Sequence, residues 1–207
     1  MTELAVRALL TLLVVVDPLG LVPPFLALTE GRDAPSRERI ARKAVLVAAF
    51  VLVAFALGGA WLLAHLGITL DAFRVAGGIL LFRIAVDMVL GQHERETPAE
   101  AAEAASRKDI SVFPLAIPLI AGPGALASVM ILAGEARPRP FGLPLVLGMA
   151  AVVLLLAYVA LRLSTPLARL LGQTGVNVIT RVLGILLAAM AVQYVADGVR
   201  GFLAPAP

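Results

Sequence analysis

The chain has 207 residues, of which 60% are hydrophobic, and its mean hydropathy is +0.97. Soluble domains contain about 45–50% apolar residues, so an excess over the whole length predicts a multi-pass membrane protein. The absence of cysteine excludes disulfides and thiolate metal sites, and the arginines behind the net charge of +3 lie between apolar runs, which argues against a nucleic-acid partner.

Six apolar segments reach the length of about 20 residues that a membrane-spanning helix needs. They cover residues 8–28, 44–64, 73–90, 110–134, 141–161 and 182–199. The first has no basic region before it and no small-residue cleavage site after it, so we expect a retained span rather than a signal peptide. Three polar connections separate the spans: a charged loop at 29–43, a long acidic segment at 92–109, and a segment at 162–177.

The arginines and lysines predict the orientation of these spans, because basic residues gather on the cytoplasmic side. Six spans place both termini on one face, which receives five basic residues, whereas the other face receives ten. We therefore expect both termini to be extracytoplasmic and the protein to lie in the inner (plasma) membrane.

Residues 17–24 read DPLGLVPP and interrupt the first span. Asp17 is a favourable N-cap and Pro18 a favourable first helical residue, so Asp17 can serve only as the cap of a half-helix. It can also face a ligand site, because a broken helix at membrane depth must be buried in protein or line a water-filled cavity. In the fourth span, Gly122, Pro123 and Gly124 make a second break, which is either a packing kink or the exposed N-terminus of a half-helix.

The third and sixth spans contain similar stretches, RVAGGILLFRIAVDMVLG from Arg74 and RVLGILLAAMAVQYVADG from Arg181, which start 107 residues apart. The two helix breaks have nearly the same offset. We therefore expect an all-α membrane protein of two inverted three-helix repeats, residues 1–91 and 110–207, joined by the polar segment 92–109. Interrupted helices at matching positions of inverted repeats are typical of secondary transporters with a midplane site.

Four of these stretches resemble the signature segments of the MarC family of bacterial and archaeal integral membrane proteins: DPLGLVPPFLALT, FRVAGGILLFRIAVDM, PLAIPLIAGPGA and ITRVLGILLAAMAVQ. The resemblance covers nearly all spans. It implies six transmembrane helices and kinship with transporters of small neutral amino acids such as glycine and alanine. Asp87 fits the family pattern, whereas Arg83 stands where an apolar residue is expected.

Several polar side chains are embedded in the spans. Arg83 and Asp87 are four residues apart and can pair on one helix face, so we expect a neutral pair that faces the bundle, with Asp87 also a candidate for ion coupling or gating. Arg74 and Arg181 begin their apolar stretches and can anchor them at opposite interfaces. Gln193 can hydrogen-bond across helices.

The function that we predict is secondary transport of a small neutral amino acid, with export as one direction open to it. The substrate-binding candidates are Asp17, Pro18 and Gly20 in the first break and Gly122, Pro123 and Gly124 in the second. Drug or metabolite efflux and a non-transporting structural subunit are the alternatives. We find no enzyme or nucleotide-binding motif and expect no cofactor or metal. The expected partners are the lipid bilayer and a small substrate, while a coupling ion (H⁺ or Na⁺) and assembly into an oligomer stay open.

Overall fold

The computed structural model describes residues 1–91 and 109–203, and within these ranges the chain forms helices and no strand. The prediction of an all-α protein is confirmed for the described residues. The helices in chain order are α1 (Thr2–Val16), α2 (Val22–Leu28), α3 (Ala34–His65), α4 (Leu70–Leu90), the irregular helix η1 (Ser111–Ile120), α6 (Pro123–Ala136), α7 (Gly142–Arg162) and α8 (Ser164–Leu203).

Three of the described helices are long and apolar enough to cross a membrane: α3, α7 and α8. The pair η1 and α6, bent by 57°, passes the same test as one broken span. The two other predicted spans fall on α1, which ends after 15 residues, and on α4, which carries four charged residues among its 21. The count of six spans therefore stays a prediction.

Two predicted connections are shorter than expected, and those boundaries were wrong. Helix α3 begins at Ala34, inside the predicted loop 29–43, and α8 begins at Ser164, so only Leu163 separates it from α7. Helix α8 continues through a kink at Gly172, whose φ of +61° suits glycine. The prediction of loops rests on the polarity of these segments, but polar residues indicate contact with solvent and not a particular backbone conformation. A polar segment at a membrane surface can therefore be helical. The acidic segment falls outside the described residues, except for Asp109.

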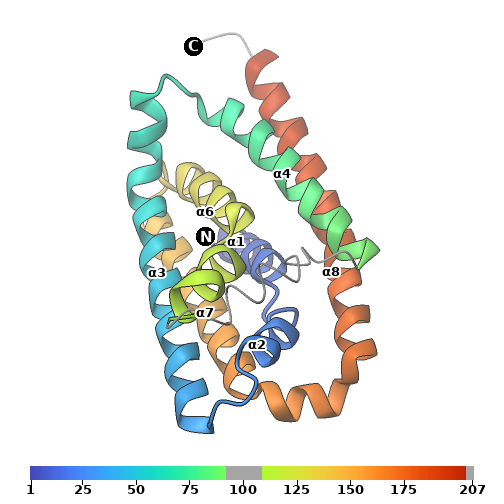
Figure 1. Cartoon of the computed structure of the whole chain (residues 1–207). Helices are drawn as coiled ribbons and strands as arrows, with labels where there is room; N and C mark the ends of the chain where they lie inside the picture. Colours follow the sequence, from blue (N-terminus) through green and yellow to red (C-terminus); the bar gives the residue numbers. More distant parts are fainter. Residues whose placement is uncertain (92–108, 204–207) are drawn as a thin grey trace.

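Helices α4 and α8 lie side by side along one side of the molecule, and α3 lies on the opposite side (Figure 1). Glycines allow the close approach of α4 and α8. A Cβ on Gly78 would lie 2.7 Å from the Ala191 carbonyl oxygen, and one on Gly184 would lie 2.8 Å from the Met88 Cβ atom. The contacts run in opposite chain directions, so the two helices are antiparallel.

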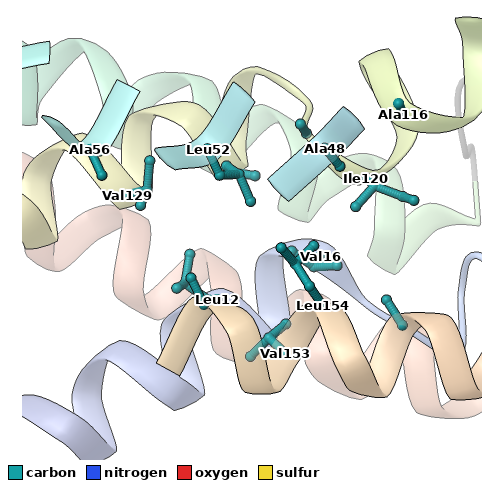
Figure 2. Close-up of a cluster of buried hydrophobic side chains, with 14 of the residues drawn as sticks. Leu12, Val16, Ala48, Leu52, Ala56, Ala116, Ile120, Val129, Val153 and Leu154 are labelled. Atoms are coloured by element: carbon teal, nitrogen blue, oxygen red, sulfur yellow. The ribbon is translucent and has the colours of Figure 1, made fainter. Parts of the chain in front are cut away.

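Between these walls, α1, α6 and α7 enclose the main hydrophobic core (Figure 2). Helix α3 contributes a stripe of small buried residues, including Ala48 and Ala56 on either side of Leu52. Leu12 of α1 and Val153 of α7 approach this stripe from the facing side. Small residues on one helix face let backbones pack closely, which drives helix association in lipid more than apolarity does.

Polar contacts tie together the helix ends around Ala34. The Arg37 guanidinium donates to the Ser164 hydroxyl at 3.0 Å, and the Tyr158 hydroxyl donates to Glu38 at 3.1 Å. Lys43 pairs with Asp109, which also accepts from the Ser111 hydroxyl. These contacts join α3 to α7, α8 and the start of η1.

Candidate functional site

The break in the first predicted span is a turn closed by the Asp17 carboxylate. Helix α1 ends at Val16, and Asp17 follows in the left-handed region with φ 43° and ψ 70°. One carboxylate oxygen accepts the Gly20 N–H at 3.1 Å, and the other accepts the Thr180 hydroxyl of α8 at 2.9 Å. Asp17 is only 6% exposed, so its carboxylate is held inside the helix bundle, and its partners include one local and one distant group.

This geometry corrects the predicted role of Asp17. It is the residue that ends α1, not the N-cap of the next helix, and Pro18 lies in the turn rather than in a helix. Helix α2 begins only at Val22, with Pro23 in its first turn. Aspartate tolerates the left-handed conformation better than most residues, because its short polar side chain can hydrogen-bond locally, as it does here to Gly20.

Position 20 must be glycine because a side chain there would collide with the Asp17 carboxylate. A Cβ at this position would lie 2.1 Å from an Asp17 carboxylate oxygen and 2.7 Å from its Cγ atom. Two of the predicted site residues, Asp17 and Gly20, are thus in direct contact, and Pro18 lies in the same turn.

The second break lies between η1 and α6. Phe113 and Ile117 are extended, as residues before proline commonly are. Gly122 is the N-cap of α6 and Pro123 its first residue, as predicted, and no side chain caps this N-terminus. A Cβ on Gly122 would lie 2.5 Å from the Pro118 carbonyl oxygen, so the chain reversal requires glycine.

The second break packs against the last turn of α1. A Cβ on Gly124 would lie 3.3 Å from a methyl of Val15, which is two residues before Asp17, and within about 3 Å of Leu81 and Ile84 of α4. Gly124 of the second break therefore lies where α1, α4 and α6 meet, next to the segment that leads into the first break.

Arg83 and Asp87 lie elsewhere. Their closest atoms, Nε and Oδ2, are 4.0 Å apart, so the predicted pair forms only at the limit of an ion pair. The Arg83 side chain is 78% exposed and that of Asp87 28%. The prediction that the pair faces the bundle interior was wrong for Arg83.

Arg74 is part of an ionic cluster, the Arg74 cluster, formed by Arg7, Asp71, Arg74 and Glu135. Arg74 pairs with Asp71 at 2.6 Å and with Glu135 at 3.2 Å, and Glu135 also pairs with Arg7 at 3.0 Å. The cluster joins α1, α4 and α6, so Arg74 links helices rather than simply anchoring α4 at an interface. The Arg7 guanidinium lies 5.8 Å from the ring centre of buried Tyr194, a cation–π distance.

A cavity of about 550 Å³ adjoins the Arg74 cluster. Its wall contains residues of the cluster together with Asp197 and Arg139. A second cavity of about 250 Å³ lies between α2 and the Gly172 kink of α8. Neither cavity is lined by Asp17 or by residues 122–124.

The remaining predicted polar residues have local roles. Gln193 is exposed and donates to Asp197 one turn later in α8 at 2.7 Å. The Arg181 guanidinium lies beside Gly91, the residue that ends α4, where a cation is favourable for the helix dipole. Within residues 1–91 and 109–203, no three His, Asp or Glu side chains are grouped closely enough to hold a metal ion.

Sequence reasoning missed Thr180, Glu135 and Arg7. Thr180 directly precedes the repeated Arg-Val-x-Gly stretch, and a hydroxyl in a buried helical position is a usable signal, because such groups need a partner. Glu135 and Arg7 are single charges near the ends of apolar runs, and no local pattern indicates that they meet.

A family model described as MarC family integral membrane protein matches residues 2–203. An UPF0056 membrane protein of Methanocaldococcus jannaschii is 40% identical over 191 residues, which cover 91% of this chain and 92% of that protein. YvbG of Bacillus subtilis, also an UPF0056 membrane protein, is 38% identical over 204 residues, or 97% and 96% of the two chains. YhcE of Escherichia coli, of the same description, is 35% identical over 195 residues, or 92% and 89%. No solved structure is similar enough to count as a match.

Proposed function

Since the chain belongs to the MarC family of integral membrane proteins, we propose that it is a secondary transporter of small neutral amino acids such as glycine or alanine. The observation that carries this proposal is the buried Asp17 carboxylate in a helix break, directly after a helix whose last turn packs against Gly124 of the second break. Such breaks are tolerated at membrane depth where they are covered by protein or line a cavity, and interrupted helices form the substrate sites of many transporters.

In this proposal the two breaks recognise the two ends of a zwitterion. The amides at the N-terminus of α6, which no side chain caps, suit the substrate carboxylate. The Asp17 carboxylate suits the ammonium group or a coupling cation such as H⁺ or Na⁺. The packing of Gly124 against Val15, Leu81 and Ile84 leaves little room, so the substrate side chain has to be small.

We also propose that residues 1–91 and 110–207 are inverted repeats that make up six spans. Gly77 and Gly184 are 107 residues apart, as are Gly91 and Gly198. In the structure the matching positions are 106 residues apart, one less than this spacing: a Cβ on Gly78 would lie 2.7 Å from the Ala191 carbonyl oxygen, and one on Gly184 would lie 3.1 Å from that of Ala85. A twofold axis between antiparallel α4 and α8 accounts for this reciprocity.

The excess of basic residues on one face supports an orientation with both termini outside the cell and the end of the molecule around Ala34 in the cytoplasm. The Arg74 cluster and its cavity then face outward. A reporter that is active only in the cytoplasm, fused to the C-terminus, should be inactive, and an active reporter contradicts this orientation.

Proteoliposomes that contain the purified protein test the function with labelled glycine and alanine. Asp17→Asn should abolish or strongly weaken uptake, while the protein stays folded. Asparagine tolerates the left-handed backbone, its oxygen can accept the Gly20 N–H, and its NH₂ group can donate to Thr180 after the hydroxyl turns. The matched control is Asp33→Asn, which makes the same change at an exposed residue and should transport like the parent.

Three outcomes are informative. If Asp17→Asn transports as well as the parent, the carboxylate has only a structural role. Export of many drugs without amino-acid flux favours an efflux protein instead. Absence of any flux from the folded parent, together with stable co-purification of a partner, favours a structural subunit.

A further inference from the structure

Arg83 is placed where an arginine is costly. Its side chain is 78% exposed on α4, and its only ion pair among the described residues is the loose one with Asp87. The large side chains nearest to it on the same helix face are apolar and exposed: Ile79 is 60% exposed, Leu80 48% and Leu90 58%. This face has the composition of a lipid contact except for the charge at its centre.

Helix packing sets the depth of Arg83. Gly78 of α4 lies against Ala191 of α8, and Ala85 lies against Gly184. Arg83 is therefore level with residues between 184 and 191, in the middle of the stretch 182–196 of α8, which contains no charged residue. The membrane interior surrounds such a stretch, and an arginine there cannot extend its guanidinium fully to either surface.

A charge at this depth requires cover by protein or water, since charged residues in membrane spans almost always avoid lipid. We propose that a second copy of this chain supplies the cover, and that α4 is the interface of a homodimer in which Arg83 of each copy pairs with Asp87 of the other. The proposal is independent of what the protein transports.

Charge complementarity selects a second copy over another occupant. Two copies inserted in the same direction are related by a twofold axis along the membrane normal, which places their α4 helices side by side with Arg83 at the same depth. Within one copy the Arg83 Nε atom lies 4.0 Å from the Asp87 carboxylate, so the two groups are at nearly the same depth, and Asp87 of one copy comes level with Arg83 of the other. The two arginines and two aspartates then form a neutral network.

The chain suits a cross-linking test, because it has no cysteine of its own. A single Val86→Cys substitution places a thiol on the proposed interface, and Phe50→Cys places one on α3, on the opposite side of the molecule (Figure 1). Both side chains are at least 36% exposed. Mild oxidation of native membranes should yield a disulfide-linked dimer from Val86→Cys and none from Phe50→Cys. Equal cross-linking, or none at Val86, overturns the proposal.

Charge variants in the Val86→Cys background test the pairing itself. Arg83→Asp places four carboxylates together and should lower the cross-linked fraction about tenfold, the scale expected for losing two interhelical polar contacts. Exchanging the two residues, with Arg83→Asp and Asp87→Arg in one chain, restores the opposite charges and should restore the dimer. Arg83→Lys keeps the charge and should retain most of it. A swapped chain as monomeric as Arg83→Asp contradicts the pairing.

Native mass spectrometry of the unmodified protein distinguishes a second copy from lipid. The expected species has twice the chain mass of 21.5 kDa. A monomer that retains an anionic lipid, and that loses this lipid in Arg83→Leu, would mean that a headgroup and not a second copy covers Arg83, and the proposal would fail.

Discussion

Gly20→Ala is a small change that tests the Asp17 turn. The new Cβ would lie 2.1 Å from an Asp17 carboxylate oxygen, whereas Cβ atoms essentially never lie within 3.0 Å of such a neighbour. The carboxylate must therefore move by about 1 Å, because repulsion rises steeply below contact distance. The backbone at Gly20 is not left-handed, so alanine adds no conformational strain of its own.

The cost follows from the hydrogen bonds that the carboxylate would lose. Its bonds to the Gly20 N–H and the Thr180 hydroxyl are 3.1 and 2.9 Å long, and a shift of about 1 Å breaks at least one of them. A hydrogen bond to a charged group contributes about 1.5–3 kcal/mol, so Gly20→Ala should lower the free energy of unfolding by about that amount, and by about twice as much if both bonds are lost.

A double-mutant cycle isolates this contact. Asp17→Gly removes the carboxylate and keeps the left-handed backbone accessible. In that background Gly20→Ala meets no obstacle and should cost nothing, or stabilise the protein by about 0.4–1 kcal/mol through the unfolded chain. Titration with SDS in mixed micelles, followed by helical circular dichroism, measures all four free energies of unfolding. If Gly20→Ala costs the same with and without Asp17, the close contact is not the cause and the description of the turn is wrong.

Two further predictions concern charges at the ends of the helices. Glu135→Gln leaves Arg7 and Arg74 without a shared anion and should lower the free energy of unfolding in the same SDS titration by about 1–3 kcal/mol. The control Glu38→Gln changes an exposed pair with Arg162 and should lower it by less than about 1 kcal/mol. Equal losses would contradict a role for the Arg74 cluster. The hydrogen bonds from Lys43 and Ser111 lower the pKa of Asp109 in the folded protein. The ionised carboxylate therefore stabilises the fold fully above the unfolded-state pKa of about 3.9, and this contribution is lost as the pH falls through the lower pKa of the folded state. Thermal unfolding of the parent should therefore shift downward below about pH 4 by more than that of Asp109→Asn, and parallel curves would refute this assignment.

The two helix breaks were predictable from the sequence, and so were α3 and α7. Proline lacks an N–H and glycine favours chain reversal, so DPLG and GPG indicate interruptions whatever surrounds them. Gly122 and Pro123 begin α6 as expected. These features depend on local chemistry, which a single sequence contains in full.

The role of Asp17 was not predictable in the same way. An aspartate before a proline suits the start of a helix, but here the preceding helix continues up to Asp17 and the turn closes on its carboxylate. Thr180, which accounts for the second carboxylate oxygen, lies 163 residues away in sequence. Arg74 and Glu135 are 61 positions apart in the sequence, so no local pattern indicates their pairing either. Tertiary contacts decide these cases, and no local pattern reports them.

Helix α4 illustrates what a test of composition leaves out. Its 21 residues make it about 31 Å long, which matches the hydrocarbon core, yet its four charges make it too polar by a test of hydropathy. Asp71 and Arg74 are neutralised in a cluster whose two arginines and two carboxylates sum to zero, with Arg7 and Glu135 supplied by other helices. Arg83 and Asp87 also sum to zero, and our proposal gives them partners in a second copy. A hydropathy test evaluates the isolated helix, whereas in the folded protein Arg74 has an ion-pair partner on another helix.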